Sequence, residues 1–470
     1  MSTVDSAAAP DASQPVSRSQ ARTAVGLLAL FELLSGFIQG GTTQLIPQIR
    51  DSFDLSTGQA QLIAAVQLLG AALCAPVFGR LGDRTGHRRL LRWALGFITL
   101  GSVLVALAPG LPLLLAGRVL LGPLAALLAL EIGLCRTRLP PQYGRQAVSV
   151  LVSTLALGSL LGALATGPVS DLVGGVRPML WVFALLAALC LALSFTRVPE
   201  STVRAHGTMD WAGALLLSAA LILFLAGISQ VNSSPLPSAA AVVAGLLLFT
   251  LWVGWERRVM HPLVDVRASA SRAMAPHLLS ALAFGVVMLA APVVCVSYLD
   301  ASAQDEGYGF GLASWQIGVC IALPQLLSFA GAALAASVAA RLGLRRMLTL
   351  AFLLTAAGHL ALLAVHDSLP LFLLAYAIAA AGMGLALGGL PSAVVEASTP
   401  DRVAGATAVY NNLKTVGGSI ASTGFAALLG SWVLGGTGSP ALGAYLTIWG
   451  VCAAVTLLAL LATLTMPTRD

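Results

Sequence analysis

Fourteen long apolar segments, separated by short polar connectors, leave this chain few folds to adopt. A helix needs about 20 apolar residues to cross the hydrocarbon core of a bilayer. Lipid offers no partners to backbone polar groups, so each such segment is expected to be a helix. The segments run near 24–46, 57–79, 91–108, 112–135, 146–168, 178–196, 211–230, 238–256, 274–298, 314–338, 347–366, 370–395, 406–431 and 440–465. The pattern predicts an all-α integral membrane protein with fourteen transmembrane helices.

The charged residues are few, and their distribution indicates a membrane topology. Only 9% of the 470 residues are charged, against about 25% in soluble domains. Of the 24 arginines, 21 fall in connectors on one side of the predicted membrane, and only Arg50 and Arg177 fall on the other. Basic residues concentrate in cytoplasmic loops, so both chain ends are predicted to be cytoplasmic in a bacterial-type plasma membrane. The net charge of +6 is therefore a topological signal and does not predict a nucleic-acid partner.

An internal repeat divides the chain into two halves. Residues 84–89, RTGHRR, recur as RLGLRR at residues 341–346, and long apolar segments flank both copies. Repeated halves are typical of secondary transporters that bind substrate between them. The predicted organisation is a disordered cytoplasmic tail (1–23), an N-terminal six-helix half (24–197), a cytoplasmic linker (198–210), an extra central helix pair (211–258), a second cytoplasmic linker (259–273) and a C-terminal six-helix half (274–466).

The densest run of charge, residues 79–92, is predicted to form a cytoplasmic loop. On its own it is compatible with a solvated loop that only sets topology. Its order of residues, GRLGDRTGHRR, resembles the signature loop between the second and third spans of the major facilitator superfamily. The second copy has Ala340 in place of Asp83, so Asp83 is expected to hold the outward-facing state by bonding across the cytoplasmic interface or capping a helix. The expected gating residues are Gly79, Gly82, Asp83, Arg84, Gly86 and Arg88.

Other segments resemble the fourteen-span drug:proton antiporters of that superfamily. The extra pair carries DWAGALL at 210–216 and WERR at 255–258, and residues 412–418 read NLKTVGG. RVLLG at 118–122 and GSLLGA at 158–163 resemble the family's R-x-x-Q-G and G-P-x-x-G-G elements with departures at Leu121, Ser159 and Ala163. The resemblance implies a major facilitator fold and proton-coupled export of a lipophilic or amphiphilic small molecule, such as an antibiotic or another drug.

Ionisable residues inside the predicted spans are candidates for proton coupling, because each is costly to bury. Glu32 in the first span, Arg118 in the fourth and Glu131 later in the fourth are the candidates. A carboxylate in an apolar cavity can bind and release a proton during a transport cycle. Structural alternatives remain open: an interhelical hydrogen bond for Glu32, a salt bridge for Arg118, and a pairing of Glu131 with Arg80, Arg84 or Arg136 near the cytoplasmic end.

Two short polar stripes are candidates for the wall of a substrate cavity. Helical spacing aligns Gln39 and Thr43 with Glu32 in the first span, and it aligns Asn411 with Lys414 in the thirteenth. Lys414 is expected to hold an anionic group or to pair with Glu32 across the cavity. The alternative is a lysine that extends its amine to the inner membrane interface.

Several functional classes find no support in the sequence. A nucleotide-driven pump needs a Gly-Lys-Ser/Thr phosphate loop, whereas the single lysine, Lys414, follows Leu413 inside a span. No zinc-ligand spacing or nucleophile elbow is present, and the six cysteines show no paired spacing. The chain is therefore predicted not to be an enzyme and to need no cofactor, metal or nucleotide. Its expected partners are a small-molecule substrate, protons and the lipid bilayer, and one chain with two halves suffices as a functional monomer.

Two other functions were weighed against export. The same fold could import a solute as a proton symporter or a uniporter, for which the departures in the fifth span are the sequence hint. A membrane enzyme or receptor would need a catalytic cluster or a sizeable soluble domain, and the sequence contains neither.

Overall fold

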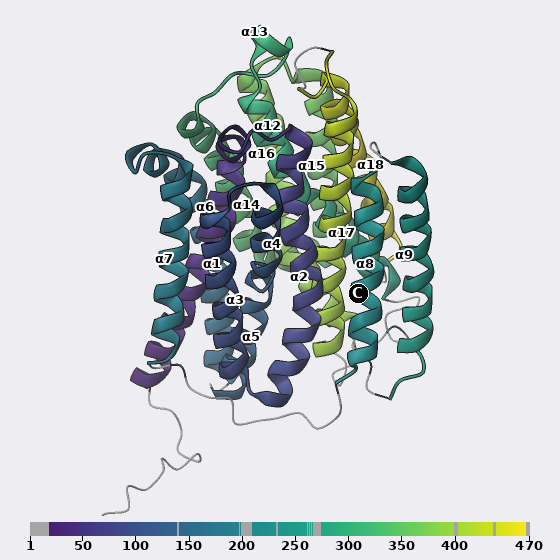
Figure 1. The fold of residues 1–470 in the computed structure, drawn as a ribbon. Coiled ribbons are helices and arrows are strands. Elements are labelled where there is room, and N and C mark those ends of the chain that lie inside the picture. Colours follow the sequence, from purple (N-terminus) through teal and green to yellow (C-terminus); the bar gives the residue numbers. More distant parts are fainter. Residues whose placement is uncertain are drawn as a thin grey trace, which may run out of the picture.

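The computed structural model describes residues 18–138, 141–196, 198, 209–231, 234–260, 262, 264, 266, 274–398, 403–435 and 439–466. In this part of the chain every regular element is helical, apart from one isolated bridge between Val433 and Pro440. The helices stand side by side in one bundle (Figure 1). The predicted tail, as far as residue 17, and most of the two predicted linkers lie outside the described residues.

The N-terminal half contains seven helices. They are α1 (Arg18–Ser52), α2 (Thr57–Thr85), α3 (His87–Leu107), α4 (Leu111–Leu120), α5 (Leu124–Arg138), α6 (Pro141–Leu172) and α7 (Val176–Ser194). Because α1 begins at Arg18, residues 18–23 are helical, and the predicted tail was too long by these residues.

The extra pair and the C-terminal half follow. The pair is α8 (Trp211–Ser229) and α9 (Pro235–Glu256). The C-terminal half contains α11 (Ala275–Gly285), the π-helix η1 (Val286–Ala290), α12 (Ala291–Asp300), the short α13 (Ala303–Glu306), α14 (Ser314–Leu342), α15 (Leu344–Val365), α16 (Leu369–Glu396), α17 (Val403–Ser431) and α18 (Leu442–Leu464). Helix α8 packs against both α2 and α17, so the extra pair lies on the seam between the halves (Figure 1).

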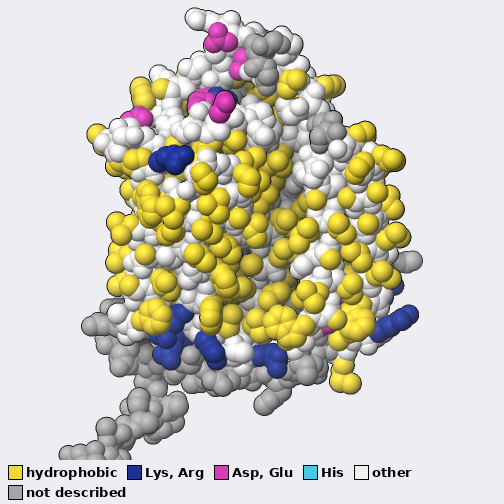
Figure 2. Space-filling model, viewed as in Figure 1, with side chains coloured by type: hydrophobic (Ala, Val, Ile, Leu, Met, Phe, Trp, Pro, Cys, Tyr) yellow, Lys and Arg dark blue, Asp and Glu magenta, His cyan; other side chains and the backbone are white. Residues whose placement is uncertain are grey.

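The surface is that of a membrane protein. Among the described residues, thirteen stretches are long and apolar enough to cross a bilayer. Helix α17, which carries Asn411, Asn412 and Lys414, is a further long helix that packs against α2 inside the bundle. An apolar belt covers the middle of the molecule, with Lys and Arg side chains at one end and Asp and Glu side chains at the end that holds α13 (Figure 2). The prediction of an all-α membrane bundle is confirmed.

Two predicted segments have a different local structure. The fourth span was expected as one helix, but the chain turns between α4 and α5 at Leu121–Pro123, where proline has no N–H to continue the helix. The predicted loop at 79–92 is a tight corner, and that prediction was wrong. Helix α2 continues to Thr85, only Gly86 leaves the helical conformation at φ 107°, and α3 begins at His87.

Glycines bring α1 and α6 into backbone contact. Gly36 and Gly40 on α1 face Gly158 and Gly162 on α6, and both helices therefore present a small-xxx-small face. A Cβ at Gly158 would overlap the carbonyl oxygen of Leu33, and the other three glycines leave as little space. Because the obstacle is backbone, a side chain at these positions would force the two helices apart.

The repeat seen in the sequence is also present in the packing. Gly285 of α11 lies against the backbone of Lys414 on α17, and Gly417 lies against Leu282, which repeats the close contact of α1 with α6. At the corners, Arg88 donates to the Val198 carbonyl oxygen just after α7, at 3.4 Å. Its counterpart Arg345 donates to the Leu464 carbonyl oxygen at the end of α18. Each corner is therefore tied to the last helix of its own half.

Adding a methyl group at Gly158 should destabilise the bundle. Overpacking a tight contact costs about 1–3 kcal/mol, so Gly158→Ala and Gly162→Ala are expected to lower the melting temperature of the purified protein, measured by fluorescence-detected size exclusion. Gly96→Ala on α3 is the matched control, because nothing lies within 4 Å of the added atom. Equal melting temperatures for Gly158→Ala and Gly96→Ala would contradict the close packing of α1 on α6.

Candidate functional site

Glu32 on α1 and Glu131 on α5 lie together inside the N-terminal half. Their side chains are 1% and 0% exposed, and their carboxyl groups are within hydrogen-bonding reach of each other. Among the described side chains no donor reaches the carboxyl oxygens of Glu131, so neither Arg80 nor Arg84 pairs with it, and the side chain of Arg136 lies outside the described residues. Helix α5 packs against α1, so Glu131 meets Glu32 inside the N-terminal half.

When both are ionised, the carboxyl groups of Glu32 and Glu131 can only accept hydrogen bonds, and neither supplies a donor. All four carboxyl oxygens are buried, and none has a hydrogen-bond partner while both groups are ionised. Two like charges 4 Å apart repel by about 4 kcal/mol even at an effective dielectric constant of about 20. A proton on one carboxyl group would supply the missing donor and remove the repulsion. The arrangement can therefore bind a proton between two side chains from different helices.

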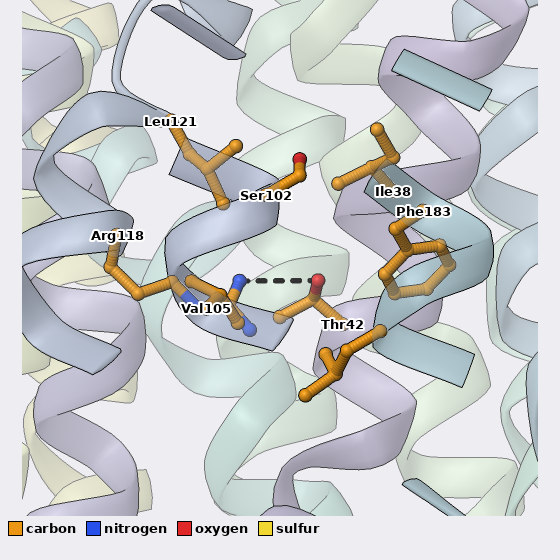
Figure 3. A pocket seen from close by; sticks show the side chains of 8 residues that line it. Ile38, Thr42, Ser102, Val105, Arg118, Leu121 and Phe183 are labelled. Carbon is orange, nitrogen blue, oxygen red and sulfur yellow. Dashed lines mark hydrogen bonds between the residues drawn. The ribbon is translucent and has the colours of Figure 1, made fainter. Parts of the chain in front are cut away.

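Arg118, at the end of α4, is buried without a carboxylate partner among the described residues. Its side chain is 1% exposed, and its Nη1 donates to Thr42 Oγ1 at 3.2 Å and to Gln67 Oε1 at 3.0 Å. Both acceptors are neutral, so the salt bridge considered for Arg118 is not formed. The side chain borders a small cavity with Ser102 and Phe183, and its guanidinium points toward Thr42 (Figure 3).

Arg118 and the Glu32–Glu131 pair lie at different heights along the helix axes of the N-terminal half. Thr42, which binds Arg118, comes ten positions after Glu32 on α1, a rise of about 15 Å along a helix. Arg118 influences the acid pair only as a distant positive charge in a medium of low dielectric constant.

The three residues of the predicted polar stripe on α1, Glu32, Gln39 and Thr43, do not share one environment. Gln39 and Thr43 are half-buried and bond locally: Gln39 Nε2 donates to Ser35 Oγ at 3.0 Å, and Thr43 Oγ1 donates to the Gln39 carbonyl oxygen at 3.1 Å. Glu32 is instead fully buried against Glu131. Gln39 and Thr43 remain candidates for a cavity wall, whereas Glu32 is turned into the N-terminal half.

The two residues of the predicted polar stripe on α17, Asn411 and Lys414, contact each other. Lys414 Nζ lies 3.4 Å from Asn411 Oδ1 and 5.7 Å from the centre of the Tyr410 ring. Asn411 is exposed and Lys414 is partly exposed, so a ligand can reach both. The pairing of Lys414 with Glu32 is not formed, because Glu32 has Glu131 as its neighbour.

The arginines of the predicted gating segment bind within their own half or to the linker. Arg92 donates to the Ser194 carbonyl oxygen at 3.1 Å, and Arg80 donates to the Pro262 carbonyl oxygen at 3.1 Å. Gly82 packs closely on Leu130, whereas nothing lies within 4 Å of a Cβ at Gly79. The side chain of Asp83 lies outside the described part of the chain, so its predicted contact stays a prediction.

The two halves meet at the α13 end, through contacts that sequence reasoning missed. Arg50 at the end of α1 forms an ion pair with Asp300 at the end of α12, with Nη2 and Oδ2 3.0 Å apart. Gln48 Nε2 on α1 donates to Ser314 Oγ on α14 at 2.8 Å. The sequence did contain a signal for this contact, because Arg50 and Asp300 are opposite charges at the same ends of the first and ninth predicted spans. These contacts close the α13 end of the bundle.

Breaking the Arg50–Asp300 pair should open the α13 end. Asp300→Asn leaves Arg50 without its partner across the interface and is expected to raise, several-fold, the rate at which a cysteine at position 314 reacts with a maleimide in detergent. Arg50→Asp combined with Asp300→Arg restores opposite charges and should return the rate toward that of the parent. Unchanged reactivity in Asp300→Asn would show that the ion pair does not hold this end closed.

Comparisons with known proteins agree with this architecture. A model of the Major Facilitator Superfamily matches residues 28–299, and a model of sugar and other transporters matches residues 270–468. A multidrug resistance protein B homolog of Mycobacterium tuberculosis is 28% identical over 410 residues, which cover 80% of this chain and 71% of that protein.

Other relatives differ in what their names say they transport. A lincomycin resistance protein of Streptomyces lincolnensis is 30% identical over 277 residues, which cover 57% of this chain and 56% of that protein. A uridine/deoxyuridine transporter of Lactococcus lactis is 28% identical and covers 65% of this chain and 66% of its own length. A solved nucleoside transporter shares the fold with a TM-score of 0.67 at 12% identity, over 94% of this chain and all of that one.

The Major Facilitator Superfamily model spans more than half of the chain, and the solved nucleoside transporter shares its fold. These findings together identify a multi-pass membrane transporter that belongs to the major facilitator superfamily.

Proposed function

We propose that this transporter is a drug:proton antiporter that exports a lipophilic or amphiphilic small molecule in exchange for protons. The observation that carries the proposal is the carboxyl pair of Glu32 and Glu131, which is buried inside the membrane-spanning bundle and has no cation or hydrogen-bond donor beside it among the described side chains. Such a site is costly unless a proton enters and leaves it. The relatives named for multidrug and lincomycin resistance support export of a drug-like substrate.

The proposal also assigns an orientation and a state. Basic residues favour the cytoplasmic side, so the arginine-rich end of the bundle would be cytoplasmic and the α13 end extracellular (Figure 2). Contacts such as the Arg50–Asp300 pair would then close the outer end, as in the inward-facing stage of alternating access. Substrate would enter between the halves near Asn411 and Lys414, whose side chains are accessible.

Proton exchange can be tested in inverted membrane vesicles with an acidic interior. Addition of ethidium or lincomycin should release protons from vesicles that contain the transporter, followed with a fluorescent pH indicator. Glu32→Gln removes one carboxyl group of the buried pair and is expected to abolish this release. A panel of compounds tested for resistance in cells that overexpress the chain would define the substrate range.

Glu256→Gln is the matched control for this experiment. Glu256 is also buried, at 3% exposure, but lies on α9 in the extra pair. It should keep normal proton release. Normal coupling in Glu32→Gln would remove Glu32 from the proton pathway, and a lack of response to every compound in the panel would argue against drug export.

Asp83 is proposed to act on conformational change and not on substrate binding. Asp83→Asn is expected to slow transport strongly while ethidium binding to the purified protein, followed by fluorescence polarisation, stays near that of the parent. Asp171→Asn, an exposed acid at the end of α6, serves as the control. If binding and transport fell together in Asp83→Asn, the residue would have a structural role.

Import remains the second candidate function. The uridine/deoxyuridine transporter among the relatives, together with Ser159 and Ala163 in the fifth span, favours it. Counterflow in proteoliposomes with the proton gradient applied in either direction separates the two. An exporter accumulates substrate against the direction of proton flow, whereas a symporter accumulates it along that direction.

A further inference from the structure

The acid pair lies away from the interface between the two halves. Glu131 belongs to α5, which packs against α1, α2, α3 and α6 of its own half. Both carboxyl groups are sealed inside this half, at 1% and 0% exposure. The accessible polar groups Asn411 and Lys414 lie on the other half, on α17. A ligand held between the halves would therefore not touch the acid pair in this state.

The charges of the N-terminal half balance when the pair holds one proton. Two ionised carboxyl groups and the Arg118 guanidinium would leave one negative charge in the low-dielectric interior, and two protonated carboxyl groups would leave one positive charge. With a single proton the three groups sum to zero. A single proton also gives the two carboxyl groups one O–H donor, whereas none of their four oxygens has a hydrogen-bond partner when both groups are ionised.

We propose that Glu32 and Glu131 share a single proton as a carboxyl dyad, and that this proton is exchanged at a site the substrate does not occupy. In the loaded state the O–H of one carboxylic acid donates to a carboxylate oxygen of the other, as in other carboxyl pairs that hold one proton. On discharge that O–H bond breaks, the proton passes to water, and two carboxylates remain. The inference rests on the proposed proton coupling and adds the number and the place of the protons.

The repulsion between the two carboxylates gives the dyad a way to act on conformation. Glu32 belongs to α1 and Glu131 belongs to α5, so loss of the shared proton drives apart two helices that the loaded dyad joins. Helix α1 also carries Arg50, which closes the α13 end. Proton and substrate would then be coupled through movement of α1, without competition for one site.

Other titratable groups near the dyad are few. The thiols of Cys135 on α5 and Cys190 on α7 face Glu131. His87 at the start of α3 packs against Gly133, two residues further along α5. Each is separate from the contact between the two carboxyl groups, so substitution of either glutamate isolates the dyad.

The test counts protons without any substrate. Purified transporter in detergent is titrated between acid and alkaline pH with a soluble pH indicator, and the protons taken up by wild type, Glu32→Gln, Glu131→Gln and the double variant are compared. A shared proton predicts that the double variant takes up one proton fewer than wild type. Each single variant takes up either the same number as wild type or one fewer, because the remaining carboxyl group is buried and can keep the proton.

Other results would overturn the dyad. If the two carboxyl groups bind protons independently, each single variant loses one proton and the double variant loses two. If neither carboxyl group titrates, no variant loses a proton. Glu131→Asp keeps a carboxyl group and should keep the proton. If a glutamine variant does not fold, the infrared C=O stretch of wild-type protein still decides the question, since a dyad loses one buried protonated carboxyl group per chain on alkalisation and independent sites lose two.

A second measurement tests the separation from substrate. Ethidium is added to wild-type protein in weakly buffered detergent solution, and the same indicator reports protons released on binding. A dyad outside the substrate site predicts less than one proton released per bound ethidium, because binding acts on the dyad only through the conformational equilibrium, whereas release of one full proton per bound ethidium wherever the dyad is loaded would contradict it. The proton count uses no substrate, so the two proposals can fail separately. If the double variant loses one proton but vesicles show no drug-dependent proton release, the export proposal alone is rejected. If vesicles show normal drug-dependent proton release but the double variant loses two protons, the dyad alone is rejected.

Discussion

The cost of placing charge in hydrocarbon governs where the ionisable groups of this protein lie. Arginines gather at one end of the bundle, acids gather at the other, and an apolar belt separates them (Figure 2). Glu32, Glu131 and Arg118 are the exceptions in the N-terminal half, each at most 1% exposed. Such groups destabilise a bundle that serves only as a scaffold, and this cost is why the proposed function assigns them to the transport cycle.

Close backbone packing holds the rest of the bundle around these groups. The glycine contact between α1 and α6 recurs between α11 and α17, and the corner arginines Arg88 and Arg345 tie equivalent helices in each half. Each half is therefore internally tight. The ion pair and hydrogen bonds between the halves lie near the α13 end, where Arg50 and Gln48 of α1 bond to α12 and α14. This division favours movement of whole halves, with rearrangement inside the N-terminal half limited to the contact between α1 and α5.

A proton site inside one half and a ligand site between the halves would place coupling in the helices that connect them. Helix α1 contributes to both regions, through Glu32 at one level and Arg50 at the other end. Helix α17 carries Lys414 and packs on both α11 and α2. The extra pair, with α8 on the seam of α2 and α17, adds an apolar surface that must slide or tilt when the halves rock.

The sequence by itself determined the all-helical membrane fold, its spans and its repeated halves. Apolar length and arginine placement depend on local composition, and the solvent, in this case lipid, acts on each segment separately. It also identified Glu32, Arg118 and Glu131 as costly groups, because a charge inside a span is visible without knowing its neighbours.

Only the tertiary structure decided which of these groups meet. Helical spacing aligned Glu32 with Gln39, but Glu32 is fully buried next to Glu131 of α5. A salt bridge was one alternative for Arg118, yet its side chain binds the neutral groups of Thr42 on α1 and Gln67 on α2. The Arg50–Asp300 contact joins residues 250 positions apart. Such pairings depend on the rotation and depth of each helix in the bundle, and these are set by packing against helices distant in the sequence.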